Sequence, residues 1–233
     1  MIKIIAEIGW NHMGNMDLAK KMIKSASNSG ADYCKFQTWS VKNLTSGPWD
    51  DDGRREIYEK AELSKDQHIL LRNFCLENNT KFMTSVFNIE DIKFLKELDN
   101  SIIKIPSHEV YNLELIDQAC QNFDQVLIST GASKWEEIKK INNQFHKYKP
   151  VLMHCVSSYP CDLSKINFPR LDKLKELSKE VGYSGHFPGI DDALVAITKD
   201  LKYVEKHFTV DKKLPGRDNE FAILPEELRL KTD

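Results

Sequence analysis

The chain has 233 residues, of which 41% are hydrophobic and 29% are charged, and its formal net charge is −2. This ordinary globular composition and near-neutral charge exclude a general electrostatic attraction to nucleic acid or to anionic lipid. No apolar run approaches the ~18 residues of a membrane-spanning helix, and five cysteines without C-x-x-C spacing indicate reduced thiols, so we expect a cytoplasmic protein with no nucleic-acid or membrane partner.

Short apolar runs alternate with amphipathic segments along the whole chain. The apolar runs predict eight β-strands, at Lys3–Ile8, Asp32–Gln37, Lys81–Val86, Ile102–Ile105, Gln125–Ser129, Val151–Cys155, Val181–Ser184 and Lys202–Lys206. Short apolar strands that alternate with helices are typical of a parallel sheet covered by helices. Eight units favour an α/β fold, a closed (β/α)8 TIM barrel, over an open doubly wound sheet, and predict a single domain over residues 1–233.

Several helix ends can be read between these strands. Ser64–Gln67 and Ser133–Glu136 each fit a capping box, in which a hydroxyl and a later side chain satisfy free backbone donors. Asn88 is placed to cap the amphipathic segment that follows it. A helix is expected to open at Pro225, and its distance from Asp233 predicts a short or truncated eighth helix.

The connection from Thr38 to Leu63 is unusually long for a barrel. It carries Arg54 and Arg55 after a run of three aspartates. Long connections of this kind serve either as lids over a functional site or as solvated excursions, and both interpretations stay open.

Polar side chains recur at the predicted strand ends. Because a barrel interior is filled by bulky apolar side chains, polar groups there indicate a ligand site at the carboxyl-end rim. They are Glu7, Lys35, Gln37, Thr84, Ser85, Lys104, Ser107, Ser129, Thr130, His154, Ser157, Tyr159, Ser184, His186 and His207.

Five of these residues suggest specific chemistry. His186 and His207 lie one βα unit apart, so they either share a divalent metal or are structural histidines. Lys35 and Lys104 interrupt apolar strands; if both point inward, they suit a phosphate or carboxylate ligand. Glu7 is a metal ligand, an acid or base, or a lysine partner.

Other histidines and carboxylates are weaker candidates. His12 either lines the site or orders its own loop. His68 and His146 fall on helices, where we expect them to be solvated. Asp191 and Asp192 are expected to cap a helix rather than bind a metal.

Eight short motifs occur in an order that resembles the sialic acid synthase family, meaning N-acetylneuraminate synthase and its relatives for other nonulosonic acids. They are Ala6-Glu7-Ile8-Gly9-x-Asn11-His12-x-Gly14, Gly30-Ala31-Asp32-x-x-Lys35-Phe36-Gln37, Lys104-Ile105-Pro106-Ser107-x-Glu109, Ser129-Thr130-Gly131, His154-Cys155-x-Ser157-x-Tyr159-Pro160, Gly182-Tyr183-Ser184-x-His186, Glu205-Lys206-His207-Phe208-Thr209 and Pro215-Gly216-Arg217-Asp218. The resemblance extends from Ile4 to Leu228.

This resemblance implies that phosphoenolpyruvate condenses with an N-acylated amino sugar, such as N-acetylmannosamine, to give a nonulosonic acid and phosphate. It implies catalytic roles for Glu7, His186 and His207, with a divalent metal, usually Mn²⁺, on the two histidines. The positions expected around phosphoenolpyruvate are Lys35, Ser85, Lys104, Ser107, Ser129, Ser157 and Ser184. Those expected near the amino sugar are Gln37, Tyr159 and Asp218.

The chain departs from the family pattern in three places. Ser157 stands where asparagine is frequent, and Gly185 stands where aspartate is common, which implies weaker metal affinity. Family members usually continue into a small antifreeze-like domain that supplies an arginine to the sugar across a dimer. We expect that domain to be absent here, so the chain is either the barrel part of such a protein or a reduced form, and a homodimer stays possible.

Two other functions stay open. One is a related synthase that condenses phosphoenolpyruvate with an aldose phosphate, for which Arg54 and Arg55 are the available extra cations. The other is a barrel that binds metal or ligand without turnover.

Overall fold

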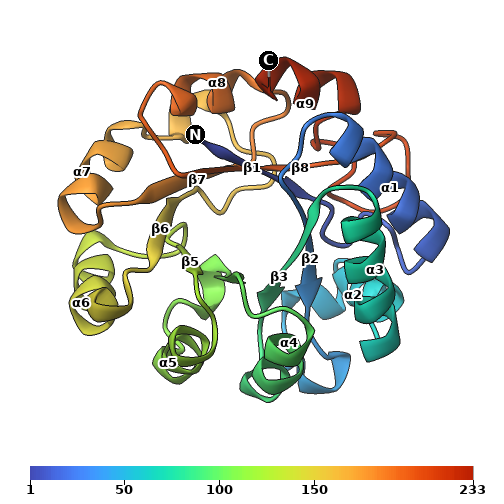
Figure 1. Cartoon of the computed structure of the whole chain (residues 1–233), viewed down its shortest axis with the longest axis horizontal. Helices are drawn as coiled ribbons and strands as arrows, with labels where there is room; N and C mark the ends of the chain where they lie inside the picture. The colour runs from blue at the N-terminus through green and yellow to red at the C-terminus, as the bar shows by residue number, and fades with distance from the viewer. Residues whose placement is uncertain (233) are drawn as a thin grey trace.

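The computed structural model describes residues 1–232, and its eight parallel strands close into a barrel in chain order (Figure 1). The strands are β1 Lys3–Glu7, β2 Tyr33–Thr38, β3 Lys81–Val86, β4 Ile103–Ile105, β5 Val126–Ser129, β6 Val151–His154, β7 Val181–Gly185 and β8 Tyr203–His207. All eight predicted strands are confirmed, and their ends lie within one residue of the predicted positions. The TIM barrel is therefore the fold, and the open sheet is excluded.

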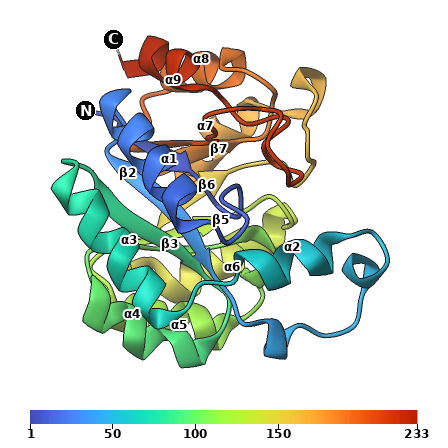
Figure 2. The ribbon, with the colours of Figure 1, turned by 90° about the vertical axis from the view of Figure 1, so that its right-hand side faces the viewer.

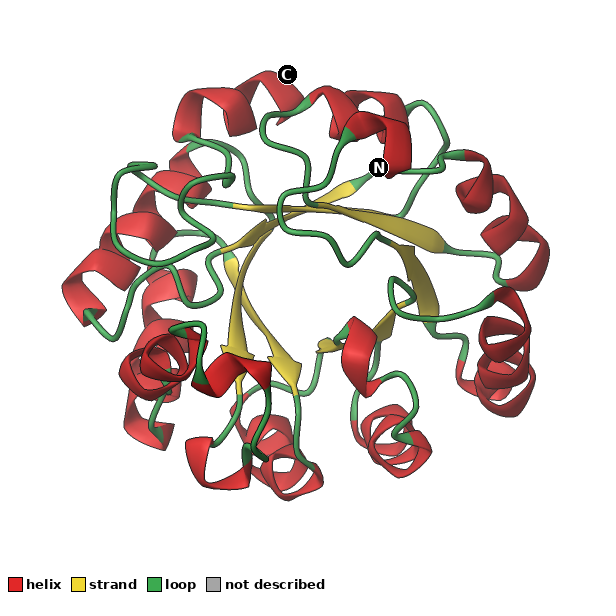
Figure 3. Ribbon diagram, turned by 180° about the vertical axis from the view of Figure 1, so that it is seen from behind, coloured by secondary structure: helices red, strands yellow, loops and turns green. Residues whose placement is uncertain are grey.

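Helices surround the barrel on its outside (Figure 3). They are α1 Met16–Asn28, α2 Arg54–Ala61, α3 Lys65–Glu77, α4 Ile92–Leu98, α5 Leu113–Asn122, α6 Trp135–Phe145, α7 Pro169–Leu177, α8 Asp191–Ile197 and α9 Pro225–Thr232. Apart from α2, which belongs to the long connection after β2, these helices pack on the apolar core around the strands, and residues such as Met22, Leu71 and Ile116 are fully enclosed. Among residues 1–232, none of these helices has the length and apolar character needed to span a bilayer. All five cysteines are buried and unpaired.

The predicted helix caps had mixed outcomes. The capping box at Ser64–Gln67 is confirmed by reciprocal bonds of 2.8 and 3.2 Å. The box at Ser133 is wrong by one residue, because the Lys134 backbone N–H donates to Glu137 at 2.5 Å and Lys134 occupies the N-cap. Asn88 does precede a helical turn, but its amide donates to Asp91 instead of accepting a backbone bond.

The barrel interior changes from apolar to polar along its axis. Buried apolar residues fill the amino-terminal part; Ile5, Met83 and Leu127 are examples. Because side chains in a strand alternate between two faces, the residue two positions further along also points inward. That rule brings Glu7, Lys35, Ser85, Lys104, Ser129 and Glu205 into the next layer of the barrel.

The long connection after β2 is structured. It contains 3-10 turns at Val41–Asn43 and Pro48–Asp50 and then α2. Figure 2 shows it projecting from the same end of the barrel as the loop that follows β8. This is the carboxyl end of the strands, where a barrel places its ligand site.

Besides His186 and His207, three histidines are buried among the described residues: His12, His68 and His154. The prediction that His68 is solvated is wrong, because its ring bonds to the Ser64 carbonyl and the Thr38 hydroxyl, each at 2.8 Å. Burial lowers the pKa of His68, and it lowers the pKa of His12 and of His154 to about 4. His146 is exposed, as predicted.

Lowering the pH from 7 to 5 is expected to weaken the fold through these histidines. Their pKa values are lower in the folded than in the unfolded chain, so their stabilisation is complete above pH 6.5 and is lost as the pH falls toward 4. For His12 and His154 the shift corresponds to about 2 kcal/mol of unfolding free energy each at pH 5. Urea unfolding at both pH values measures this, with His146→Gln as the control. An unfolding midpoint that does not fall at pH 5 would contradict the expectation.

Candidate active site

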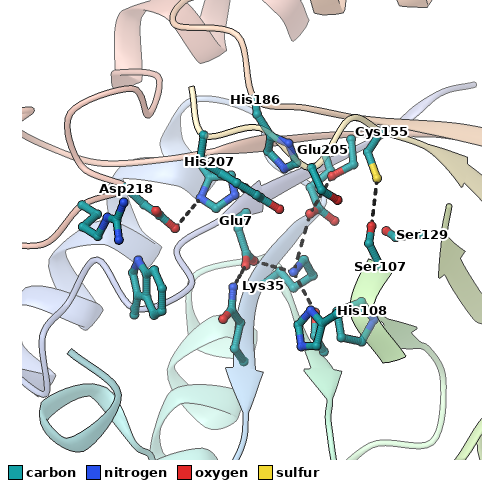
Figure 4. Close-up of a pocket in the computed structure, with 18 of the residues that line it drawn as sticks. Glu7, Lys35, Ser107, His108, Ser129, Cys155, His186, Glu205, His207 and Asp218 are labelled. Atoms are coloured by element: carbon teal, nitrogen blue, oxygen red, sulfur yellow. Dashed lines mark hydrogen bonds and ion pairs between the residues drawn. The ribbon is translucent and has the colours of Figure 1, made fainter. Parts of the chain in front are cut away.

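A pocket of about 610 Å³ opens at the carboxyl end of the barrel (Figure 4). All thirteen residues expected from the family resemblance line it: Glu7, Lys35, Gln37, Ser85, Lys104, Ser107, Ser129, Ser157, Tyr159, Ser184, His186, His207 and Asp218. Thr84, Thr130 and His154 were also expected at the rim, but their side chains bond instead to Thr38, to the Met153 carbonyl and to the Ile166 carbonyl. Thr84 and His154 occupy the alternate strand positions, which face outward.

Four charged side chains form the floor of the pocket, and we call them the charged quartet: Glu7, Lys35, Lys104 and Glu205. The Lys35 ammonium lies 2.7 Å from Glu7 Oε2 and 3.6 Å from Glu205 Oε1. The Lys104 ammonium lies 2.7 Å from the same Glu205 oxygen and 3.3 Å from the Ser184 hydroxyl. All four side chains are at most 5% exposed, so the two lysines do point inward.

The ion pairs of the quartet shift the pKa values of Glu205 and Lys35. Burial opposes ionisation of Glu205, yet the Lys104 and Lys35 ammonium groups outweigh it and hold the pKa of this carboxyl below its usual range. Burial also opposes the charge of Lys35, but Glu205 and Glu7 raise the pKa of its ammonium. The floor therefore carries two fixed cations that are balanced by two carboxylates.

Glu205 is a residue of the pocket floor that the sequence did not single out as a site residue. It sits at the centre of β8, two positions before His207, and so it shares the inward face of that strand with the histidine. The signal that could have identified Glu205 is its position: it is a carboxylate within a strand that is buried along its whole length.

A cradle of small polar groups lies beside the quartet. The Ser107 hydroxyl accepts from the Gly131 backbone N–H at 3.2 Å and contacts the Cys155 sulfur at 3.1 Å. A Cβ on Gly131 would lie 2.6 Å from Cys155 Sγ, 2.7 Å from Ser157 Oγ and 2.9 Å from Ser107 Oγ. Glycine is therefore needed here to let the three side chains converge. The buried Ser129 hydroxyl has no hydrogen-bond partner among residues 1–232.

The two histidines lie together above the quartet (Figure 4), with ring centroids 5.4 Å apart. His186 Nδ1 bonds to the Val156 carbonyl at 2.7 Å, which leaves Nε2 as the basic nitrogen of a neutral ring. Burial and the nearby His207 hold the pKa of His186 well below its usual range. His207 Nδ1 is 3.3 Å from Asp218 Oδ2 but outside hydrogen-bond geometry.

This donor set suits a divalent metal only in part. A neutral His186 and an uncommitted nitrogen on His207 are the chemistry that a borderline metal prefers. Among residues 1–232, however, no group of three His, Cys, Asp or Glu side chains is placed to hold a metal ion. A metal on these two histidines would need its remaining ligands from water or substrate.

The long connection and the loop after β8 build the outer wall of the pocket. Trp10, Tyr58 and Phe87 supply aromatic surface, and Arg54 and Arg217 supply charge. Asp52 joins the two segments, with an oxygen 2.8 Å from Arg54 and 3.5 Å from Arg217. Arg54 lines the pocket, so the connection is a part of the site and not a solvated excursion.

The contacts of His12 and Asp192 show that neither lines the pocket. His12 accepts the Gly14 backbone N–H at 3.0 Å and is fully buried, so it orders its own loop. The prediction that Asp192 caps a helix is wrong, because its carboxylate makes a buried ion pair with Lys206 at 2.9 Å.

Comparison with known proteins gives matches over nearly the whole barrel. A family model described as the NeuB family matches residues 22–231. The N,N'-diacetyllegionaminic acid synthase of Campylobacter jejuni is 34% identical over 244 residues, which cover 97% of this chain and 73% of that protein. The N-acetylneuraminate-9-phosphate synthase of Drosophila melanogaster is 34% identical over 246 residues, covering 99% and 66%. A crystal structure of N-acetylneuraminic acid (sialic acid) synthetase from Leptospira borgpetersenii in complex with citrate aligns with a TM-score of 0.91 at 32% identity, covering 99% of this chain and 81% of that one.

Proposed function

The chain belongs to the NeuB family, and we propose that it condenses phosphoenolpyruvate with an N-acylated amino sugar to give a nonulosonic acid and phosphate. The named relatives are synthases of N,N'-diacetyllegionaminic acid and of N-acetylneuraminate 9-phosphate. The observation that carries the proposal is the pocket, in which two buried lysines and two histidines meet at one end of the barrel. Five unpaired cysteines support a cytoplasmic site of action.

Phosphoenolpyruvate is assigned to the quartet and the cradle. Its carboxylate and phosphate are anions, for which Lys35 and Lys104 act as fixed point charges. The hydroxyls of Ser107, Ser129 and Ser157 add neutral donors beside them. Because these groups are already held in place, they stabilise the charge that moves onto phosphate without first reorganising.

The reaction forms one carbon–carbon bond and breaks one carbon–oxygen bond. The methylene carbon of phosphoenolpyruvate attacks the aldehyde carbon of the open-chain sugar, and the aldehyde oxygen takes up a proton. Water adds to the second carbon of the phosphoenolpyruvate portion and loses a proton. The bond from that carbon to the phosphate oxygen then breaks, the remaining hydroxyl proton passes to the departing phosphate, and the keto acid is left. We assign to Glu7, a member of the charged quartet, the role of accepting the proton from this water.

His186 and His207 are the residues that we assign to a divalent metal, with Mn²⁺ as the expected ion. When bound, the metal would polarise the aldehyde oxygen of the sugar as a Lewis acid. The uncommitted Nδ1 of His207 and the neutral ring of His186 support this assignment. The Val156 carbonyl fixes the tautomer and the orientation of His186.

The amino sugar is assigned to the outer part of the pocket, beside Gln37, Tyr159 and Asp218. Gln37 donates to Glu7 at 2.6 Å, and the Tyr159 ring lies 4.1 Å from the His186 ring, so both adjoin the reaction centre. A phosphorylated amino sugar is the second candidate acceptor. It is favoured by Arg54 and Arg217, which both line this outer part.

The deciding experiment is phosphate release from phosphoenolpyruvate with Mn²⁺, with and without a chelator. The panel of acceptors contains N-acylated amino sugars and their phosphate esters. Release that needs one acceptor and stops with chelator is expected and would identify the substrate. Phosphoenolpyruvate binding in calorimetry without release from any acceptor would contradict the proposed turnover. Absence of binding would contradict the assigned lysine site as well.

Replacing Gly131 with alanine is expected to raise KM for phosphoenolpyruvate at least about tenfold, because the added methyl group occupies the centre of the cradle. KM for the amino sugar is expected to change little, because that ligand is assigned to the opposite wall. Steady-state kinetics with each substrate varied in turn measures the difference. Equal effects on both KM values would argue against the assignment of the cradle to phosphoenolpyruvate.

A further inference from the structure

A buried ion pair lies outside the barrel, between β7, β8 and α8. Asp192 and Lys206 are 0% and 2% exposed, and the ammonium of Lys206 donates to both oxygens of Asp192 at 2.9 Å. The Tyr183 hydroxyl also donates to Asp192, at 3.0 Å. Burial lowers the pKa of Lys206, and the Asp192 carboxylate opposes that shift.

Lys206 also makes a hydrogen bond to the backbone just past the end of β7. Its ammonium donates to the Phe187 carbonyl at 2.7 Å. The ladder between β7 and β8 ends at the pair Gly185 and Lys206. His186 and His207 are the next residue on each strand, so the Lys206 side chain continues the connection between the two strands where the backbone ladder stops.

The carboxylate occupies a space that a side chain on β7 would otherwise fill. A Cβ on Gly185 would lie 2.0 Å from Asp192 Oδ2. Gly185 has no positive φ angle, so its backbone does not itself require glycine. The absence of a side chain at residue 185 is therefore what admits the carboxylate from α8.

We propose that Asp192 is a positioning residue: it holds the Lys206 ammonium on the Phe187 carbonyl and thereby fixes the separation of His186 and His207. The expected effect of Asp192 on metal binding rests on the proposed function. Its expected effect on the positions of the two imidazole rings does not. Groups that orient the side chains of a metal site typically change metal affinity 10–100-fold when removed.

The first test compares Asp192→Asn with Asp191→Asn in the whole metal-free protein. Asparagine keeps the volume and a bond to Tyr183 but loses the charge. Asp191 is an exposed neighbour on the same helix and serves as the matched control. Nitrogen–proton correlation spectra of the imidazoles are expected to show displaced His186 and His207 resonances in Asp192→Asn alone. Resonances that coincide with those of the original protein would overturn the proposal.

Metal affinity is the second readout, measured by Mn²⁺ titration with electron paramagnetic resonance. Asp192→Asn is expected to weaken Mn²⁺ binding about 10–100-fold, and an unchanged affinity would overturn the proposal. If the original protein itself binds no Mn²⁺, the metal assignment fails, and the imidazole spectra alone decide the positioning role. If Asp192→Asn does not fold, Lys206→Met replaces it, because it removes the bond to Phe187 while keeping the apolar stem.

A carboxylate moved to β7 gives the sharpest control. The double variant Gly185→Asp with Asp192→Ala returns a carboxylate to Lys206 from residue 185, where the added Cβ enters the space vacated by Asp192 and the Tyr183 ring, 2.7 Å from that Cβ, has to shift. It is expected to recover at least half of the displacement of the imidazole resonances seen in Asp192→Ala. A double variant that behaves like Asp192→Ala would show that the carboxylate does not act through Lys206.

Discussion

Replacing His207 with alanine is expected to lower kcat about 1,000-fold or more. His207 is assigned to the metal, whose polarisation of the aldehyde contributes several kcal/mol, and ~4 kcal/mol corresponds to about 1,000-fold. Phosphoenolpyruvate affinity is expected to change less than about threefold, because Lys35 and Lys104 lie in a different layer of the barrel. The loss of kcat is measured as turnover with Mn²⁺. The affinity for phosphoenolpyruvate is measured by calorimetry.

The control for His207→Ala is His146→Ala, which removes an exposed imidazole far from the pocket lining. Undiminished activity in His207→Ala would remove the metal assignment. A matched loss of phosphoenolpyruvate affinity would instead mean that the histidine layer and the quartet act as a single binding surface.

The second large effect is expected in the charged quartet. Lys104→Met leaves Glu205 with only the more distant Lys35, and Glu205→Gln leaves the Lys104 ammonium without an anion. Removal of one partner from a buried ion pair costs about 3–5 kcal/mol, because the remaining charge stays desolvated. Urea unfolding of each single variant measures this cost.

The double variant Lys104→Met with Glu205→Gln provides the control. Lys35 keeps Glu7 at 2.7 Å, so no buried charge is left without a partner. Its loss of stability is expected to be well below the sum of the two single losses. Additive losses would show that the pair is not coupled. Lys104→Met and the double variant are expected to lose phosphoenolpyruvate-dependent turnover, because Lys104 is assigned to the substrate.

The fold was predictable because its signals are local and repeat eight times. The apolar runs placed both ends of every strand within one residue. The alternation of side chains along a strand then predicted which of them point into the barrel interior. The same period explains the failures at Thr84 and His154, which were placed at the rim although they occupy outward positions. Helix caps were harder to predict, because the first residue of a helix can shift by one position without changing the sequence pattern. The predicted cap was Ser133, and the observed cap is Lys134.

The misses in the site share one physical cause. Glu205 and Asp192 are carboxylates whose partners, Lys104 and Lys206, lie on other elements. His68 bonds to the Ser64 carbonyl of its own segment, and its second ring nitrogen is satisfied because β2 brings Thr38 beside it. No spacing along the chain encodes such pairs; they follow from which elements the barrel makes neighbours. Twelve of the thirteen lining residues follow from their places at predicted strand ends, and only Asp218 rests on the motif resemblance alone.

The charged quartet is electrically neutral before any ligand arrives. Two lysines in a barrel interior would otherwise repel each other and would need an anion in order to fold, but Glu7 and Glu205 remove that requirement. The protein can therefore fold first and bind later, with its cations already in place. The corollary is that the quartet itself brings no surplus positive charge to phosphoenolpyruvate, so the divalent metal assigned to His186 and His207 is expected to supply part of the missing balance.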